Sequence, residues 1–284
     1  MISALLGLTS ALGLGTADFM ARFSARALGA APTYAVVLLI GSVATTIWVV
    51  VSGAELVWSP YGCAIAVAHG MSVSVMCILL YEGMARGPIA VVAPIVASHP
   101  VPVLIVNVLM GVRPSAVQWG AMAVVILGGV LISRHAISDA EPSQAKANRT
   151  TILIALGACL AYVAIVLTAQ TATPLIGELQ TMWIGRWAGL VFIALILAIQ
   201  RAPVRVPRSW WPFVGLQGAL DSLGYLAFLA GANSASPHVT MVVASAFSVV
   251  TVLLARVVIN EQISRLQWFA IALIAAGTAI LSGT

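Results

Sequence analysis

A polar stripe interrupts one of the apolar segments in the second half of the chain. Asp221 lies near the middle of this segment, and Gln217 and Tyr225 flank it at i−4 and i+4, so the three share one face of a helix. A carboxylate at this depth in a bilayer is costly, and such residues face an interior and mark a pathway or a proton site. The stripe therefore predicts a substrate pathway or a proton site within a membrane. The alternative is a structural carboxylate that joins helices by hydrogen bonds.

A second group of polar and polarisable side chains shares one face of the third apolar segment. His69, Ser72 and Met76 follow one another at i, i+3 and i+7, and Ser72 corresponds to Asp221 at an offset of 149 residues. His99 lies in the fourth apolar segment. Because an unperturbed histidine titrates near pH ~6.5, His69 and His99 are candidates to carry protons together with Asp221.

The remaining candidates suit recognition of a charged substrate. Tyr162 and Tyr225 offer aromatic faces for cation–π contact with an ammonium group, and capture of that group is the competing role for Asp221. Arg186 is expected to be an anchor that extends to the membrane surface, with contact to an anion as the alternative. Ser245 adds a hydroxyl in the ninth segment.

The first segment carries charged residues near its end. Asp18 and Arg22 are four positions apart, which is the spacing of an ion pair on a helix. This spacing favours a structural pair over a role for Asp18 in substrate binding.

Prolines interrupt the fourth segment. Pro94, Pro100 and Pro102 lie inside an otherwise apolar run, and each internal proline frees a backbone carbonyl. Within a bilayer a freed carbonyl is tolerated only against protein or a water-filled cavity. The fourth segment is therefore expected to line a cavity, with His99 beside the break.

Composition places these segments in a membrane. Of 284 residues, 61% are hydrophobic and 7% are charged, and the mean hydropathy is +1.08. Ten apolar runs reach the ~20 residues that a span requires. They cover residues 3–22, 31–51, 61–84, 88–110, 116–133, 151–171, 177–199, 210–231, 236–258 and 266–282. The runs lack the alternation of membrane barrels, so the expected fold is all-α and integral to the cell membrane.

A short stretch occurs twice at a constant offset of 149 residues. One copy reads GVRPSAVQWG and the other NEQISRLQWF. The residues that correspond are Ser115 with Ser264, Gln118 with Gln267, and Gly128 with Gly277. A serine followed three positions later by glutamine predicts a capping box at the start of a helix. The register therefore indicates two copies of one five-helix unit.

The repeat predicts the organisation of the chain. Residues 1–133 and 151–284 form the two units, and the polar residues 134–150 join them. Because each unit has five spans, an odd number, the second must be inverted relative to the first. Inverted repeats are typical of secondary transporters, whose substrate site lies near the midplane. Small residues in the fifth and tenth runs are expected to pack these helices against each other.

Basic residues gather on one side of the predicted membrane. Eleven of the thirteen follow odd-numbered spans, against Arg113 on the other side and Arg186 within a span. The eleven are Arg22, Arg26, Arg86, Arg134, Lys146, Arg149, Arg201, Arg205, Arg208, Arg256 and Arg265. The positive-inside rule then places both termini outside the cytoplasm.

The motifs expected of other classes are missing from the sequence. It contains no HExxH or paired histidines for a metal, no nucleotide-binding loop, and no basic patch for nucleic acid, so no cofactor is expected. An intramembrane enzyme that uses His69, His99 and Asp221 remains an alternative, although no GxSG-like nucleophile setting or paired aspartates appear. A structural or receptor subunit is the third possibility. The expected partners are a small-molecule substrate and lipid, with the protein a monomer or a homodimer.

Two five-helix units, each ending in a helix pair joined by a G-E-x-x-S turn, resemble the EamA domains of the drug/metabolite transporter superfamily. The resemblance covers nearly the whole chain. The family's glutamate is kept at Glu261, whereas Val112 replaces it in the first unit. Pro100 stands at the family's proline in span 4, and Val249 takes that place in the second unit.

The resemblance implies a transporter with a central cavity surrounded by spans 1, 3, 4, 6, 8 and 9. Family members export amino acids, other metabolites or drugs, so export of small amphipathic metabolites is expected. The family is more often drawn with both termini in the cytoplasm, which is opposite to the orientation that the charge count predicts.

Overall fold

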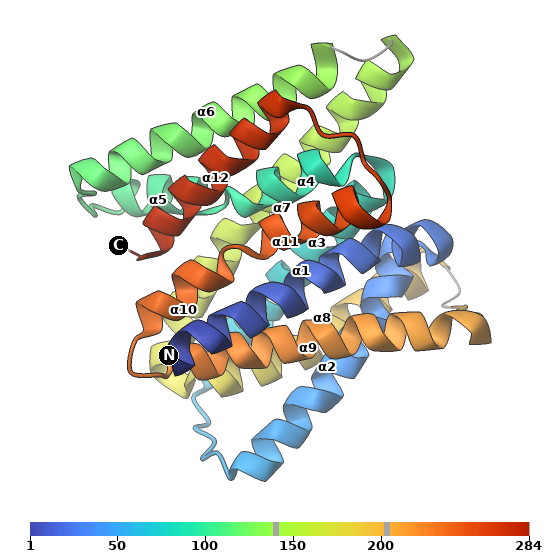
Figure 1. Cartoon of the computed structure of the whole chain (residues 1–284). Helices are drawn as coiled ribbons and strands as arrows, with labels where there is room; N and C mark the ends of the chain where they lie inside the picture. Colours follow the sequence, from blue (N-terminus) through green and yellow to red (C-terminus); the bar gives the residue numbers. More distant parts are fainter. Residues whose placement is uncertain (139–141, 202–204, 284) are drawn as a thin grey trace.

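The computed structural model is a bundle of α-helices and describes residues 1–138, 142–201 and 205–283 (Figure 1). In chain order the elements are α1 (Ile2–Leu28), α2 (Ala30–Ser52), α3 (Pro60–Arg86), α4 (Ile89–Ala97), α5 (Pro100–Leu109), α6 (Ala116–Ser138), α7 (Pro142–Ile176), α8 (Glu178–Ile199), the 3-10 turn η1 (Arg208–Trp210), α9 (Trp211–Ala232), α10 (Pro237–Ala244), α11 (Phe247–Val258) and α12 (Arg265–Gly283). These ranges contain no strand, and the predicted all-α class is confirmed.

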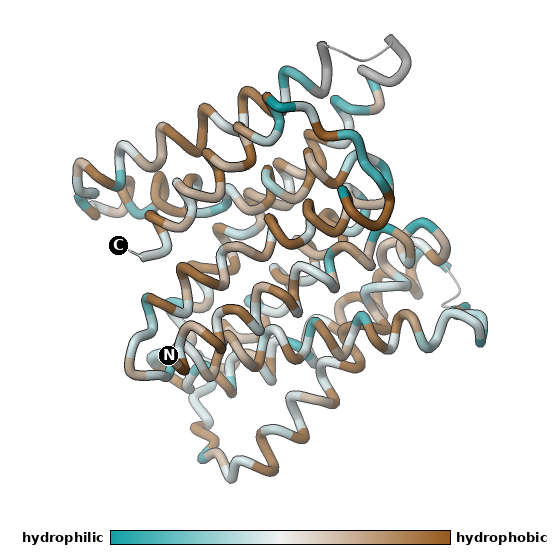
Figure 2. The backbone as a smooth tube through the Cα atoms, in the orientation of Figure 1, coloured by the Kyte–Doolittle hydropathy of each residue, from teal (hydrophilic) through white to brown (hydrophobic). Residues whose placement is uncertain are grey.

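Ten helical segments of the described chain are long and apolar enough to cross a membrane, which confirms the predicted number of spans. Span 4 consists of α4 and α5, and span 9 of α10 and α11. Hydrophobic residues follow the helices, and hydrophilic segments lie mainly at helix ends (Figure 2). Large apolar side chains such as Leu109 and Ile199 are exposed on the bundle. Such a surface suits contact with lipid.

Both spans that contain two helices are broken near the middle. In span 4, α4 ends at Ala97 and α5 begins at Pro100, so the break predicted from the prolines is present and His99 lies within it. In span 9 the break falls between Ala244 and Phe247, where the sequence has no proline. The break in span 9 is therefore a feature that the proline pattern did not predict.

A serine marks each of the two breaks. The hydroxyl of Ser98 donates to the carbonyl oxygen of Ile95 at 2.6 Å, and the hydroxyl of Ser245 donates to that of Val242 at 2.7 Å. A serine that bonds to the backbone of the preceding turn bends helices. The shared serine thus supplies a local cause for the break in span 9.

The repeated turn has the hydrogen bonds of a capping box in both copies, as predicted. The Ser115 amide donates to Gln118 Oε1 at 2.9 Å, and the Gln118 amide donates to Ser115 Oγ at 3.2 Å. The corresponding distances between Ser264 and Gln267 are 2.8 and 3.2 Å. These side chains satisfy amides that a helix start leaves without partners, so α6 and α12 begin in the same way.

The predicted contact between spans 5 and 10 is confirmed, since α6 packs against α12. A Cβ added to Gly128 would lie 2.7 Å from Cγ1 of Ile274 and 2.9 Å from the carbonyl oxygen of Ala270. A Cβ added to Gly277 would lie 2.9 Å from the carbonyl oxygen of Ala121. The two helices approach closely only because both positions lack a side chain.

When each helix is replaced by its counterpart in the other unit, the same helix pairs are in contact. α1 packs on α9 as α7 packs on α3, and α2 packs on α9 as α8 packs on α3. The pairs α2 with α8 and α6 with α12 each correspond to themselves. In Figure 1, α1 therefore lies beside α9, which is distant in the sequence.

The loop before α12 reaches across to the first unit. Both carboxylate oxygens of Glu261 accept hydrogen bonds from the first turn of α4, from the amides of Ile89 at 3.1 Å and Ala90 at 2.9 Å. Amides at a helix start lack partners in their own helix and attract negative charge. This contact, the Glu261 clamp, joins the second unit to span 4.

The segment expected as a linker, residues 134–150, is largely helical where it is described. α6 extends to Ser138 and α7 begins at Pro142, while residues 139–141 lie outside the described chain. The polar composition therefore marked the ends of two long helices and not an extended connection.

Candidate functional site

A cavity of about 120 Å³ lies within the bundle, between the two units. Side chains from α1, α3, α4, α7, α9 and α11 line it, which are the spans that the family resemblance implied. α2 and α8 line it as well. α6 and α12 contribute no lining residue, in keeping with their role in packing the units together.

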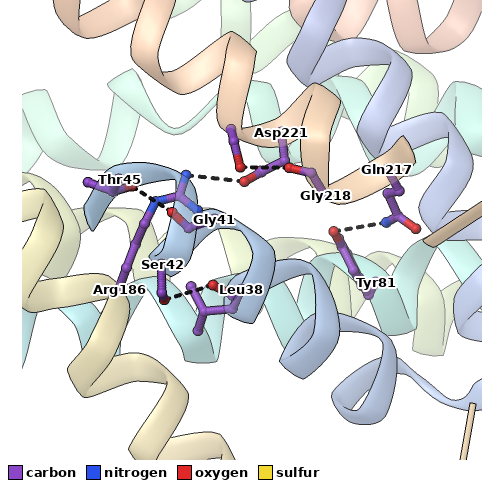
Figure 3. A network of polar contacts seen from close by, with 10 residues as sticks. Leu38, Gly41, Ser42, Thr45, Tyr81, Arg186, Gln217, Gly218 and Asp221 are labelled. Carbon is purple, nitrogen blue, oxygen red and sulfur yellow. Dashed lines mark hydrogen bonds and ion pairs between the residues drawn. The ribbon is translucent and has the colours of Figure 1, made fainter. Parts of the chain in front are cut away.

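An ion pair crosses one side of this cavity. Nη2 of Arg186, on α8, donates to Oδ2 of Asp221, on α9, at 3.2 Å. The Arg186 side chain is 9% exposed and that of Asp221 is 24% exposed. Figure 3 shows the guanidinium extending past α2 toward the carboxylate. The interpretation of Arg186 as an anchor at the membrane surface is therefore wrong, because its head is buried in the bundle.

A glycine on α2 makes room for the guanidinium. A Cβ at Gly41 would collide with Nη1 of Arg186, so any larger residue would displace the arginine from its place. On another side, Cζ of Arg186 lies 5.3 Å from the centre of the Tyr225 ring, within reach of a cation–π contact. Tyr225 also lines the cavity. The face of this ring is thus already used by a cation of the protein.

His69 is held in one orientation at the cavity wall. Its Nδ1 lies 3.1 Å from the carbonyl oxygen of Ile165 and 3.2 Å from Oγ1 of Thr168, both on α7. A carbonyl oxygen only accepts, so Nδ1 carries the proton, and Nε2 of the neutral ring is free of a proton. His69 can therefore take up a proton at Nε2. Met76, on the same helix, lines the cavity too.

Tyr162 lines the cavity and His99 stacks on it from the side of span 4. The two ring centres are 3.7 Å apart, and the planes meet at 15°. His99 is not among the lining residues, and its Nδ1 lies 3.3 Å from the carbonyl oxygen of Val96. His99 thus positions Tyr162 and is separated from the cavity by it.

Three predicted site residues lie elsewhere. Gln217 is fully buried and donates to the Tyr81 hydroxyl at 3.0 Å (Figure 3). It also accepts from Ser24 at 2.7 Å, so it joins α9 to α3 and α1. The hydroxyl of Ser72 donates to the carbonyl oxygen of its own helix one turn back, as the hydroxyl of Ser245 does. Within the polar stripe on α9, Asp221 and Tyr225 therefore line the cavity, whereas Gln217 joins neighbouring helices.

Asp18 lines the cavity, whereas the sequence favours a structural ion pair between Asp18 and Arg22. Arg22, its expected partner, instead donates to the carbonyl oxygens of Met84 and Gly87 at the end of α3. No ion pair joins Asp18 to Arg22, so that prediction is wrong. Asp18 and Asp221 thus line the same cavity. The sequence did signal this residue, since a carboxylate within a span is itself a reason to expect an interior position.

Other lining residues carry no such signal in the sequence. Tyr34, Cys77 and Met182 belong to apolar runs in which every face carries similar residues. The described chain holds no group of three His, Cys, Asp or Glu residues that could bind a metal. The arrangement can therefore bind charged groups and move protons, with Asp18, His69, Arg186 and Asp221 among the polar groups at the cavity.

The comparisons with known proteins agree with this architecture. Residues 149–283 match the sequence profile of the EamA-like transporter family. A solved crystal structure of a protein aligns with a TM-score of 0.66 and 18% identity, over 98% of this chain and 96% of its own. At that identity the likeness shows the fold alone. No curated protein matches the sequence. The matched range covers nearly all of the second unit, which confirms the resemblance of this unit to the EamA domains of the drug/metabolite transporter superfamily.

Proposed function

We propose that the protein is a secondary transporter that exports small amphipathic metabolites, amino acids or related compounds, through the central cavity. The family match suggests a membrane transporter of the drug/metabolite type, and this family consists of transporters. The main support for the finer proposal is the cavity itself, which is enclosed by both units and has charged groups at its wall. Its apolar lining, which includes Leu38, Val73 and Val96, suits the apolar part of such a substrate.

Alternating access would follow from movement of one unit against the other. The pattern of helix contacts that recurs on exchange of the units supports an inverted repeat, in which such movement exposes a fixed site to each side in turn. The breaks in spans 4 and 9 support it as well, because Val96 and Phe247, next to the breaks, line the cavity. Broken helices at a central site are typical of secondary transporters.

A proton gradient is the proposed energy source. His69 lies at the cavity, and a proton carrier must face each side in turn. The unprotonated Nε2 of His69 supports a role in proton uptake. His99 is a weaker candidate, since Tyr162 lies between it and the cavity.

The proposed orientation has both termini outside the cytoplasm of a cell membrane, as the distribution of basic residues indicates. A reporter that is active only in the cytoplasm, fused after Gly283, tests this. We expect no activity from the fusion and activity from the same reporter placed after Ile199, at the end of α8. The reverse result would place the termini inside.

Transport is best tested with purified protein in liposomes loaded with labelled amino acids. We expect efflux that an imposed pH gradient drives and that empty liposomes lack. Val73→Trp should block efflux, because Val73 lines the cavity and an indole would fill it. Val75→Trp is the matched control, since Val75 is 40% exposed on the outside of the same helix. Equal efflux by the two variants would contradict passage through this cavity.

A further inference from the structure

We propose that Asp18, and not Asp221, is the carboxylate with which the cavity binds a substrate, through an ammonium group of that substrate. The inference rests on the proposed transport function and names the chemical class of its substrate, a small organic cation with an apolar body. Asp221 has a different task in this scheme, which is to hold Arg186.

The pairing of charges at the cavity separates the two aspartates. Asp221 is already bound to Arg186 at 3.2 Å, so its charge is matched by a cation of the protein. Asp18 lines the same cavity, and across the described ranges no hydrogen bond or ion pair engages its carboxylate. Arg22 cannot serve as its partner, because its guanidinium is engaged by backbone carbonyls at the end of α3.

When both aspartates are ionised, the charged groups at the cavity sum to one unmatched negative charge. Asp18 and Asp221 are acidic and Arg186 is basic, while His69 is neutral when only Nδ1 holds a proton. An unmatched carboxylate within a membrane is unfavourable, and a cation that binds beside it removes the penalty. A substrate ammonium meets this requirement.

Helix packing keeps the two carboxylates together and raises the need for a cation. α1 and α9 approach so closely that a Cβ at Gly13 would lie 2.8 Å from the carbonyl oxygen of Leu220 and 2.9 Å from Cα of Gly224. Asp18 and Asp221, which line the same cavity, are thereby carried on two helices in close contact. Arg186 matches only one of them, so a bound ammonium would complete the pairing.

Aromatic residues line the same cavity as Asp18. Tyr34, Tyr162 and Phe247 line the cavity together with Asp18, and their faces attract cations. Tyr225 is excluded from this role because its ring already faces Arg186. The stacking of His99 on Tyr162 fixes the orientation of one of these rings. This aromatic environment favours an organic ammonium over a proton as the ligand of Asp18.

Calorimetry on the purified protein in detergent tests the inference. The ligands are alkylammonium ions, from methylammonium to hexylammonium. We expect saturable binding that strengthens with alkyl length, and no binding of the corresponding neutral alcohols. Asp18→Asn should weaken binding at least about tenfold, and Glu82→Gln, which removes a carboxylate from a surface pair with Arg86, should leave it unchanged. Size-exclusion profiles check that each variant is folded.

The decisive variant is the double substitution Asp221→Asn with Arg186→Gln. It removes both members of the ion pair and leaves Asp18 as the carboxylate at the cavity, so we expect binding to weaken less than in Asp18→Asn. A loss of binding in the double variant as large as that in Asp18→Asn, or unchanged binding in Asp18→Asn, would overturn the inference. If Asp18→Asn fails to fold, saturable ammonium binding by the folded double variant supports Asp18 as the ligand, and its absence overturns the inference.

The result also separates this inference from the proposed function. Ammonium binding without flux in liposomes would keep Asp18 as the binding residue and count against transport. Flux of uncharged substrates, without ammonium binding, would keep transport and overturn the inference. An Asp18→Asn variant that loses only its response to a pH gradient, in a protein that binds no ammonium, would make Asp18 a proton carrier and would overturn it too.

Discussion

Neutralising one member of the Arg186–Asp221 pair should destabilise the protein far more than neutralising both. Removal of one partner from a buried pair costs about 3–5 kcal/mol, because the other charge is left unmatched in a poorly solvated place. Arg186 is 9% exposed, but the Asp221 side chain is 24% exposed, so we expect the lower end, about 3 kcal/mol, for Arg186→Gln or Asp221→Asn. The double variant keeps similar shapes without charge and should lose about 1 kcal/mol or less.

Reversible unfolding in mixed micelles, followed by far-UV circular dichroism, would measure these differences. The coupling energy between the two positions should be several kcal/mol if each single variant costs about 3 kcal/mol and the double variant almost nothing. The surface pair of Arg86 and Glu82 is the control, with a distance of 2.6 Å but side chains that are 51% and 35% exposed. For it we expect a coupling of about 0.5 kcal/mol. Equal coupling for the two pairs would refute the argument that burial makes the central pair important.

Three further substitutions test the packing and the caps by the same unfolding assay. Gly128→Leu should lower the free energy of unfolding by about 1–3 kcal/mol, because the new side chain would collide with α12. Gly129→Leu, with open space beside it, should lower it little. Similar losses for the two variants would contradict the close approach of α6 and α12. Ser264→Ala should cost about 1 kcal/mol through loss of a helix cap, and no loss would show that the capping box is dispensable. Glu261→Gln removes the charge from the clamp and should cost about 1–2 kcal/mol; a stability equal to that of the wild type would mean that the clamp contributes nothing.

Features that depend on neighbouring residues were predictable from the sequence. The ten spans follow from hydropathy, and the capping box of Ser115 and Gln118 needs only a spacing of three residues. The contact between α6 and α12 was predictable because the repeat marks Gly128 and Gly277 as equivalent positions. The break in span 4 followed from proline chemistry in the same way.

Partners distant in the sequence were not predictable in this way. The spacing of Asp18 and Arg22 suggested a local pair, but Arg22 binds carbonyl oxygens 62 and 65 positions away. Arg186 likewise binds Asp221, 35 positions away, and no helical periodicity relates residues on different helices. The break in span 9 was missed because a serine bend is a weaker signal than a proline, since serine also occurs in straight helices.

The Glu261 clamp has a consequence for the order in which the chain is made. The first turn of α4 enters the membrane early, yet the carboxylate that satisfies two of its amides lies 171 and 172 positions later in the chain. Until the ribosome has produced the loop before α12, these amides have to rely on water or lipid head groups for hydrogen bonds. The first unit therefore cannot reach its final hydrogen bonding on its own, and biosynthesis of the second unit completes the first.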